Sequence, residues 1–166
     1  MAENNCVIYL GKSEYDILKK DFDLVIKIQK YCQKITGSKI ELSAYEAPNS
    51  ENFDKIAPKI GVYISPYSKK VNKIQLFSCG LEDAIFLQDF DELKEIDLRK
   101  NNLKGLPESV CELIEKNNIN PQDTVIYVFG NPINSESEHG IKTDGLFSIF
   151  FLNKKYCLID ELLVKD

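Results

Sequence analysis

The spacing of apolar residues changes along the chain, and in three places it predicts β-strands. CVIYL at 6–10 is a short apolar run that ends at Gly11, which is typical of a buried strand. In KIELSAY at 39–45 and KIGVYIS at 59–65, apolar residues alternate with others. This alternation predicts strands with one buried face.

Between the first two of these segments, the spacing is that of a helix. Apolar residues recur at steps of three and four from Leu18 to Ile35, and Gly37 is well placed to end the helix. Ser13 offers an N-cap and Asp16 stands three positions after it, so we expect the helix to begin there. The first 45 residues are therefore predicted to form a β-α-β unit.

Farther along the chain, one irregular spacing occurs three times. LKEIDLRKNNL at 93–103 carries apolar residues at offsets 0, 3, 5 and 10 and an asparagine at offset 8. VNKIQLFSCGL at 71–81 matches all five positions with cysteine for asparagine, and DTVIYVFGNPI at 123–133 matches four. The copies start 22 and 30 residues apart, and the longer interval has room for a helix that begins at Pro107.

These segments resemble the leucine-rich repeat, L-x-x-L-x-L-x-x-N/C-x-L, which asks for asparagine or cysteine at Cys79, Asn101 and Asn131. The resemblance implies that each L-x-L is a short strand with inward apolar side chains, and that the copies stack into a parallel sheet. An asparagine at the bend can hydrogen-bond the backbone of neighbouring coils. The alternative is a mixed α/β domain in which two βα units share this spacing by chance.

The predicted fold class is α/β, with a short leucine-rich-repeat-like parallel sheet and packed helices in a single domain over 1–166. Its parts are a β-α-β capping region at 1–66, the repeat region at 71–133 and a C-terminal hairpin cap at 146–160. The hairpin is predicted because two apolar runs flank Asn153-Lys154-Lys155. Caps are needed at both ends because an open repeat array would leave apolar surface in water.

The resemblance also implies a binding face, because residues between the inward leucines of this family face outward and usually contact the partner. Here these residues are Lys73, Gln75, Phe77, Glu95, Asp97, Arg99, Val125, Tyr127 and Phe129. In register, one column would be Phe77, Arg99 and Phe129, and another Gln75, Asp97 and Tyr127. Aromatic residues beside arginine are typical of interface hot spots.

Arg99 is the only arginine of the chain, and we expect it to be exposed, because a buried arginine requires a paired charge. For Phe77 and Phe129 a second interpretation stays open. If the protein covers this face with its own helix, both rings are core residues.

Charge narrows the choice of partner. The formal net charge of −5 disfavours nucleic acid, because phosphate binding requires a basic face. Between residues 82 and 97 seven acidic residues stand against one lysine. The candidate acidic patch consists of Glu82, Asp83, Asp89, Asp91 and Glu92. Such runs are commonly a solvated face, and the alternative is an attractive field for a basic partner.

The lack of a visible targeting signal and the cysteine usage favour a cytoplasmic protein. No apolar run approaches the roughly 20 residues that cross a bilayer, and no secretory signal is visible at the N-terminus. The five cysteines are scattered and odd in number, which disfavours a disulfide framework or a zinc site and favours small buried hydrophobes. We expect no cofactor, metal or membrane contact.

Catalytic patterns are weak. His139 is the only histidine, in a polar segment without the strained turn of a nucleophilic serine, and no phosphate-binding glycine loop occurs. The carboxylate pairs Asp21/Asp23 and Asp89/Asp91 fit no calcium-loop pattern, and the first pair would point to different helix faces. An enzyme acting through Cys79 or His139 is the least favoured hypothesis.

A small acidic chain without an active-site pattern has the profile of an inhibitor. We therefore expect a non-catalytic protein-binding module. The best hypothesis is a bacterial immunity protein that neutralises a basic, nuclease-type toxin of a contact-dependent growth inhibition system, by analogy with acidic inhibitors of basic nucleases. Lysine-, asparagine- and isoleucine-rich usage favours a bacterial source. The alternative is a leucine-rich-repeat adaptor or effector that docks a host or signalling protein.

Overall fold

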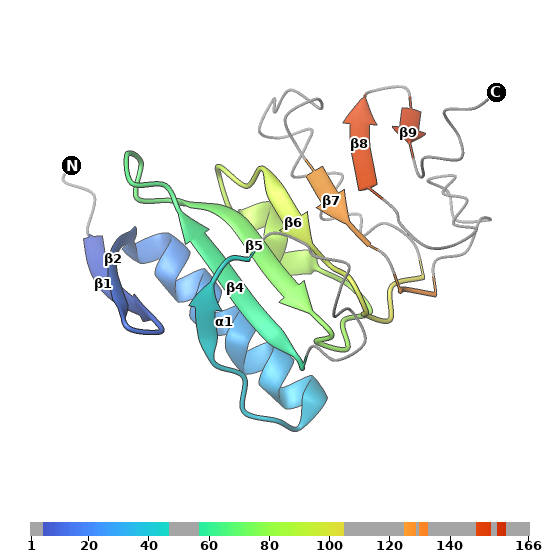
Figure 1. Cartoon of the computed structure of the whole chain (residues 1–166), viewed down its shortest axis with the longest axis horizontal. Helices are drawn as coiled ribbons and strands as arrows, with labels where there is room; N and C mark the ends of the chain where they lie inside the picture. The colour runs from blue at the N-terminus through green and yellow to red at the C-terminus, as the bar shows by residue number, and fades with distance from the viewer. Residues whose placement is uncertain are drawn as a thin grey trace.

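The computed structural model describes residues 5–46, 57–104, 125–128, 130–132, 149–153 and 156–158. Its elements are β1 (Asn5–Leu10), β2 (Ser13–Leu18), α1 (Lys19–Thr36), β3 (Leu42–Ala44), β4 (Lys59–Ile64), β5 (Val71–Phe77), the 3₁₀ helix η2 (Ile85–Asp89), β6 (Glu95–Asp97), β7 (Val125–Tyr127), β8 (Ile149–Asn153) and β9 (Tyr156–Leu158). β1 and β2 form a two-stranded sheet, and the other strands form a sheet in the order β3-β4-β5-β6-β7-β8-β9 (Figure 1). The predicted α/β class is confirmed.

The N-terminal region differs from the prediction at one element. Ser13 does not cap a helix; it begins β2, which pairs antiparallel with β1 through the tight turn at Gly11. Gly11 has a φ of 66°, a left-handed conformation that glycine adopts without strain. The order is therefore β-β-α-β rather than β-α-β, because a short hairpin uses the residues that resemble a capping box.

Helix α1 follows the predicted apolar face. Val25, Ile28 and Cys32 are buried at steps of three and four, and Gly37 ends the helix with a φ of 65°. Asp21 is also buried, whereas Asp23 is exposed, so the two carboxylates point to different faces as predicted. Gly37 is thus confirmed as the stop signal of the helix.

The centre of the large sheet contains the three copies of the repeated spacing. β5, β6 and β7 are parallel, with Ile74, Ile96 and Ile126 in register. On one side, β4 adds antiparallel to β5 and β3 parallel to β4; on the other, the β8–β9 hairpin adds antiparallel to β7. The three segments therefore pair in parallel at the centre of the sheet, and β8 and β9 form a hairpin at its edge.

The turns after these three strands share one backbone feature, and two of the turns share a hydrogen-bond pattern. Ser78, Lys100 and Gly130, each directly before the cysteine or asparagine of its copy, have positive φ. Asn101 accepts the Leu81 N–H at 3.0 Å and donates to the Leu76 carbonyl at 2.7 Å. Asn131 repeats this one strand further, with the Leu103 N–H at 3.0 Å and the Leu98 carbonyl at 2.8 Å. Each asparagine therefore joins its own turn to the preceding one.

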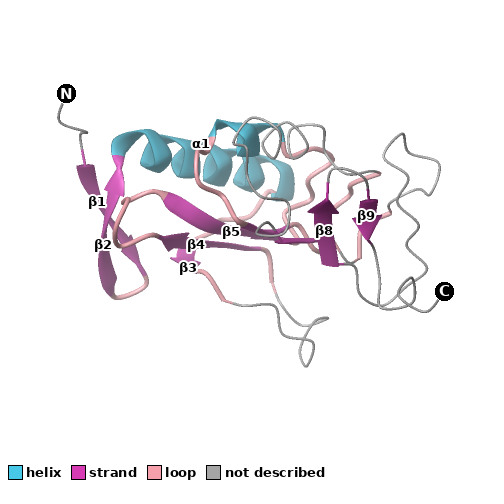
Figure 2. Cartoon of the chain, turned by 90° about the horizontal axis from the view of Figure 1, so that it is seen from above, coloured by secondary structure: helices cyan, strands magenta, loops and turns pink. Residues whose placement is uncertain are grey.

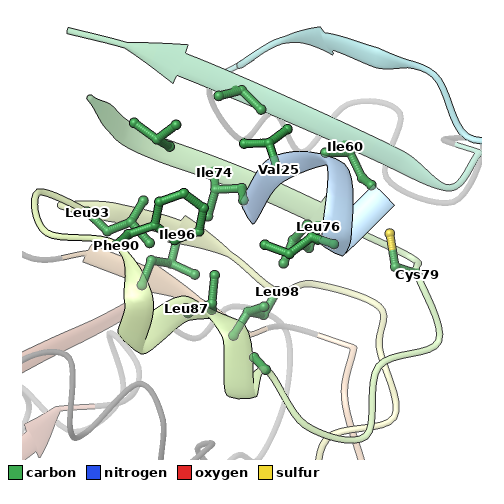
Figure 3. Packing of buried hydrophobic residues seen from close by; sticks show 14 of the residues in the cluster. Val25, Ile60, Ile74, Leu76, Cys79, Leu87, Phe90, Leu93, Ile96 and Leu98 are labelled. Atoms are coloured by element: carbon green, nitrogen blue, oxygen red, sulfur yellow. The ribbon is translucent and has the colours of Figure 1, made fainter. Parts of the chain in front are cut away.

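The main core lies on one side of the large sheet, where α1 and η2 pack (Figure 2). Ile74, Leu76, Ile96 and Leu98 point from the strands toward Leu87 and Val25 of the helices (Figure 3). The same alternation sends the intervening side chains to the outer face. None of the helices in the described ranges is long and apolar enough to cross a membrane.

Several predictions fall outside the described residues. They are the helix that begins at Pro107, and the positions of Phe129 and of His139 with its polar segment. These expectations stay predictions.

Candidate functional site

The outer face of the large sheet, opposite α1 and η2, carries most of the residues predicted to bind a partner. Cross-strand register aligns Tyr63, Lys73 and Glu95 in one row. A second row contains Gly61, Gln75, Asp97 and Tyr127. The predicted column of Gln75, Asp97 and Tyr127 is therefore confirmed by the pairing.

The first row is a network of charged and aromatic side chains. Lys73 Nζ lies 2.6 Å from Glu95 Oε2, and the Tyr45 hydroxyl donates to Glu95 Oε1 at 2.6 Å. Lys73 Nζ also lies 5.5 Å from the ring centroid of Tyr45 and 5.9 Å from that of Tyr63. Such cation–π contacts, together with the ion pair, hold the lysine in one position.

The electrostatics of this network keep Glu95 ionised. Burial by itself would raise the pKa of Glu95, but hydrogen bonds from Lys73, Tyr45 and Tyr127 outweigh burial and lower it. Burial and the carboxylate of Glu95 raise the pKa of Tyr127 to about 12 and also raise that of Tyr45. At neutral pH, Glu95 is therefore an anion held by neutral tyrosine hydroxyls and one lysine.

In the second row lies a buried ion pair. Arg99 donates to both oxygens of Asp97, from Nε to Oδ1 and from Nη2 to Oδ2, each at 2.8 Å. Gln75 Nε2 donates to Asp97 Oδ2 at 2.9 Å. The Arg99 guanidinium also lies 5.3 Å from the ring centroid of Phe77. The pair is bidentate, the geometry in which arginine and carboxylate interact most strongly.

Burial corrects part of the predicted binding face. Arg99 is only 6% exposed, so the expectation of an exposed arginine is wrong; the charge that it requires is supplied by Asp97, two residues earlier on the same strand face. Phe77, Gln75 and Asp97 are buried as well, at 0%, 3% and 0% exposure. On this face Lys73, Glu95 and Tyr127 are more accessible than these buried residues.

Three residues of this face were missed by sequence reasoning. Tyr45 follows β3 directly, and Tyr63 and Gly61 lie on β4. A Cβ at Gly61 would lie 2.8 Å from Gln75 Oε1 and 3.2 Å from Tyr45 Cα, so glycine permits this close approach. Strand alternation places these residues on the face opposite the helices, and that signal could have found them.

Some residues of the acidic patch form ion pairs with lysines and others do not, among the described residues. Asp91 pairs with Lys20 at 3.0 Å, and Glu92 pairs with Lys70 at 3.4 Å and accepts from Ser68 at 2.7 Å. These two carboxylates are therefore neutralised within the protein. Glu82, Asp83 and Asp89 form no ion pair with a basic residue among the described residues.

Among the described residues, no three or more histidine, cysteine or acidic side chains form a cluster suited to a metal ion. Cys32 and Cys79 are fully buried and share a hydrogen bond, which raises the pKa of Cys79 and lowers that of Cys32. The burial of these two cysteines agrees with the prediction of small buried hydrophobes.

No family model, no curated protein and no solved structure matches this chain.

Proposed function

We propose that the protein is a non-catalytic protein-binding module whose outer sheet face contacts the partner, with β5, β6 and β7 as a short leucine-rich-repeat-like scaffold. Two features support the scaffold. The left-handed residue recurs at the same position of the three segments, and Asn101 and Asn131 make equivalent bonds to the preceding turn. Repeats of this kind stack through nearest-neighbour contacts.

The observation that carries the binding proposal is the network of Tyr63, Lys73 and Glu95 with Tyr45. Tyr63 is 44% exposed, and the Lys73 side chain is 36% exposed while it contacts both tyrosine rings and Glu95. Tyrosine is enriched among interface hot spots. Side chains that are ordered before binding lose less entropy when the partner arrives.

We further propose that the partner is a basic, nuclease-type toxin, and that the protein acts in the bacterial cytoplasm as the immunity protein of a contact-dependent inhibition system. The net charge of −5 supports this proposal, as do Glu82 and Asp83, whose carboxylates form no ion pair with the basic residues that the structure describes. Opposite charges speed the encounter, and an acidic inhibitor can cover the cleft that binds phosphate.

Affinity capture from a lysate of the source organism at low salt tests the proposal, with the wild type, Tyr63→Ala and Tyr67→Ala as baits. Tyr67→Ala is the matched control, because it makes the same change at a side chain that is 95% exposed. We expect wild type and Tyr67→Ala to retain a basic nuclease. Tyr63→Ala should weaken binding about tenfold in a titration of the purified pair.

The captured nuclease should also lose its activity when the purified protein is added. Equal binding by Tyr63→Ala would contradict the proposed face. A captured partner that is a signalling protein without nuclease activity would instead favour the adaptor hypothesis.

A further inference from the structure

Strand β1 has one edge that is open in the described part of the chain. β1 pairs with β2 on one side, and no described strand pairs with its other edge. In both Figure 1 and Figure 2, β1 lies at the left end of the described chain, and the large sheet lies to its right. The described residues therefore leave room for another strand at this edge.

The register of the β1–β2 hairpin shows which backbone groups point to the open edge. Leu10 and Ser13 flank a two-residue turn, so they form a hydrogen-bonded pair. Bonded and non-bonded pairs alternate along an antiparallel ladder. Asn5, Val7 and Tyr9 are therefore in non-bonded pairs, and their N–H and C=O groups point away from β2.

A hydrogen bond of β2 supports this assignment. Leu18 is opposite Asn5, and its N–H is donated at 2.8 Å to the carbonyl of Lys69, which lies outside the hairpin. The pair of Asn5 and Leu18 is thus a non-bonded one, and so are the pairs of Val7 and Tyr9, two and four residues further along β1. The outward backbone groups of these three residues of β1 have no backbone partner among the described residues.

The open edge lacks the features that commonly protect such edges. Proteins block them with charged side chains, prolines or bulges. NCVIYL at 5–10 contains neither a charged residue nor a proline, and its pairing with β2 is regular. The side chains at the edge positions are exposed, with 46% for Val7 and 62% for Tyr9. β1 is therefore suited to pair with another uncharged strand.

The strand that matches this edge is β1 of a second copy. When two β1 strands run antiparallel with their Val7 residues opposite each other, Asn5 of each copy is opposite Tyr9 of the other. All outward N–H and C=O groups of these residues then have partners. On the other face, Cys6 is opposite Ile8 of the second copy, so apolar residues meet apolar residues and no charges are opposed.

We propose that the protein forms a two-fold symmetric dimer in which the β1 strands of two copies pair antiparallel about Val7. The two hairpins then form one sheet in the order β2-β1-β1-β2. Because the contact is short, the dissociation constant should be on the order of 10–100 µM. The net charge of −5 opposes the association of two copies, so the dimer should become tighter as salt is added. No residue of the outer sheet face belongs to β1, so the dimer does not depend on the function proposed above.

Sedimentation equilibrium of the full chain from about 5 µM to about 1 mM tests the proposal. We expect the average mass to rise from that of one chain towards that of two. Val7→Pro removes the outward N–H but no bond to β2, and it should weaken the dimer at least about tenfold. Val7→Thr is the matched control, since it keeps the N–H and the β-branched shape; it should dimerise within about twofold of the wild type.

Hydrogen exchange locates the contact. The amides of Val7 and Tyr9 should exchange more slowly as the protein concentration rises, whereas that of Ile8, which already faces β2, should change little. Circular dichroism verifies that each variant is folded. If Val7→Pro is unfolded, Val7→Lys takes its place, because it sets two lysines opposite each other at the centre of the dimer.

Three results would overturn the proposal. The first is a chain that stays monomeric up to about 1 mM, including one whose β1 edge binds only a different protein. The second is a dimer that the folded Val7 variant leaves unchanged, because another surface would then form the contact. The third is exchange at Val7 and Tyr9 that does not depend on concentration.

Discussion

Two carboxylates, Asp97 in β6 and Asp21 in α1, are both fully buried and differ in their partners. Both oxygens of Asp97 accept hydrogen bonds, from Arg99 and Gln75. Asp21 Oδ2 accepts the Val71 N–H at 2.7 Å, and its Oδ1 has no partner among the described residues. Asp97 is therefore paired with a cation and has both oxygens hydrogen-bonded, although Gln75 Oε1 beside it has no partner among the described residues, whereas only one oxygen of Asp21 is bonded.

These two carboxylates indicate where the protein is sensitive to a change of charge. A buried charge is tolerated when it is paired and costs several kcal/mol when it is not. Burial raises the pKa of Asp21, whereas the Val71 N–H, Lys20 and Lys70 lower it less strongly. Removing the partner of Asp97 should therefore destabilise the protein most, and removing the charge of Asp21 itself should destabilise it least.

The largest expected effect is that of Arg99→Ala. The substitution leaves the Asp97 carboxylate buried without its cation and should lower the free energy of unfolding by about 3–5 kcal/mol. Urea unfolding followed by circular dichroism measures this difference. The double variant Asp97→Asn/Arg99→Met removes both charges and should be less destabilised than Arg99→Ala. Equal loss in the two variants would mean that packing, rather than the unpaired charge, accounts for the cost.

Asn101→Ala is expected to have the second-largest effect on stability. It removes bonds to the Leu81 N–H and to the carbonyls of Leu76 and Leu98 and leaves these backbone groups unsatisfied. The free energy of unfolding should fall by about 2–3 kcal/mol. Asn102→Ala is the control; its side chain is exposed and should cost less than about 0.5 kcal/mol in the same urea titration. Similar losses in both would contradict the role given to the asparagine bonds between turns.

Glu95→Gln should cost about 1–2 kcal/mol at pH 7, because it weakens the bonds with Lys73 and Tyr45. The pKa of Glu95 is lowered in the folded state, so its stabilisation is present above its ordinary value of 4.5 and is lost as pH falls through the folded pKa. The difference between wild type and Glu95→Gln should thus shrink below pH 4.5. A difference that is constant with pH would show that ionisation of Glu95 contributes nothing.

Asp21→Asn should have the smallest effect, and it should stabilise the protein rather than destabilise it. The folded pKa of Asp21 is raised above its ordinary value of 3.8, so the charged form is destabilising at pH 7 and this penalty disappears as pH falls below 3.8. Asparagine can still accept the Val71 N–H. We expect the variant to be more stable by up to about 1 kcal/mol at neutral pH and equal to wild type in acid. Thermal unfolding at pH 7 and pH 3.5 distinguishes this from a destabilising loss of the carboxylate.

The repeated spacing was informative because it depends on local chemistry. Isoleucine and leucine at offsets 3 and 5 predicted the strands and register of β5, β6 and β7, and Asn101 and Asn131 predicted the bonds between turns. Gly37 likewise marked the end of α1. These features are set by a residue and its near neighbours.

What the sequence by itself determined is therefore the inward side of each strand, the helix that covers it and the residues at the bends. Only the tertiary structure decided how the outward side is used. Ser13 begins a strand because β1 is close enough to pair with it, and Arg99 can be buried because Asp97 supplies the paired charge and the Phe77 ring lies against its guanidinium. The physical reason is that strand alternation tells which side chains share a face, but burial and pairing on that face depend on segments brought together by folding.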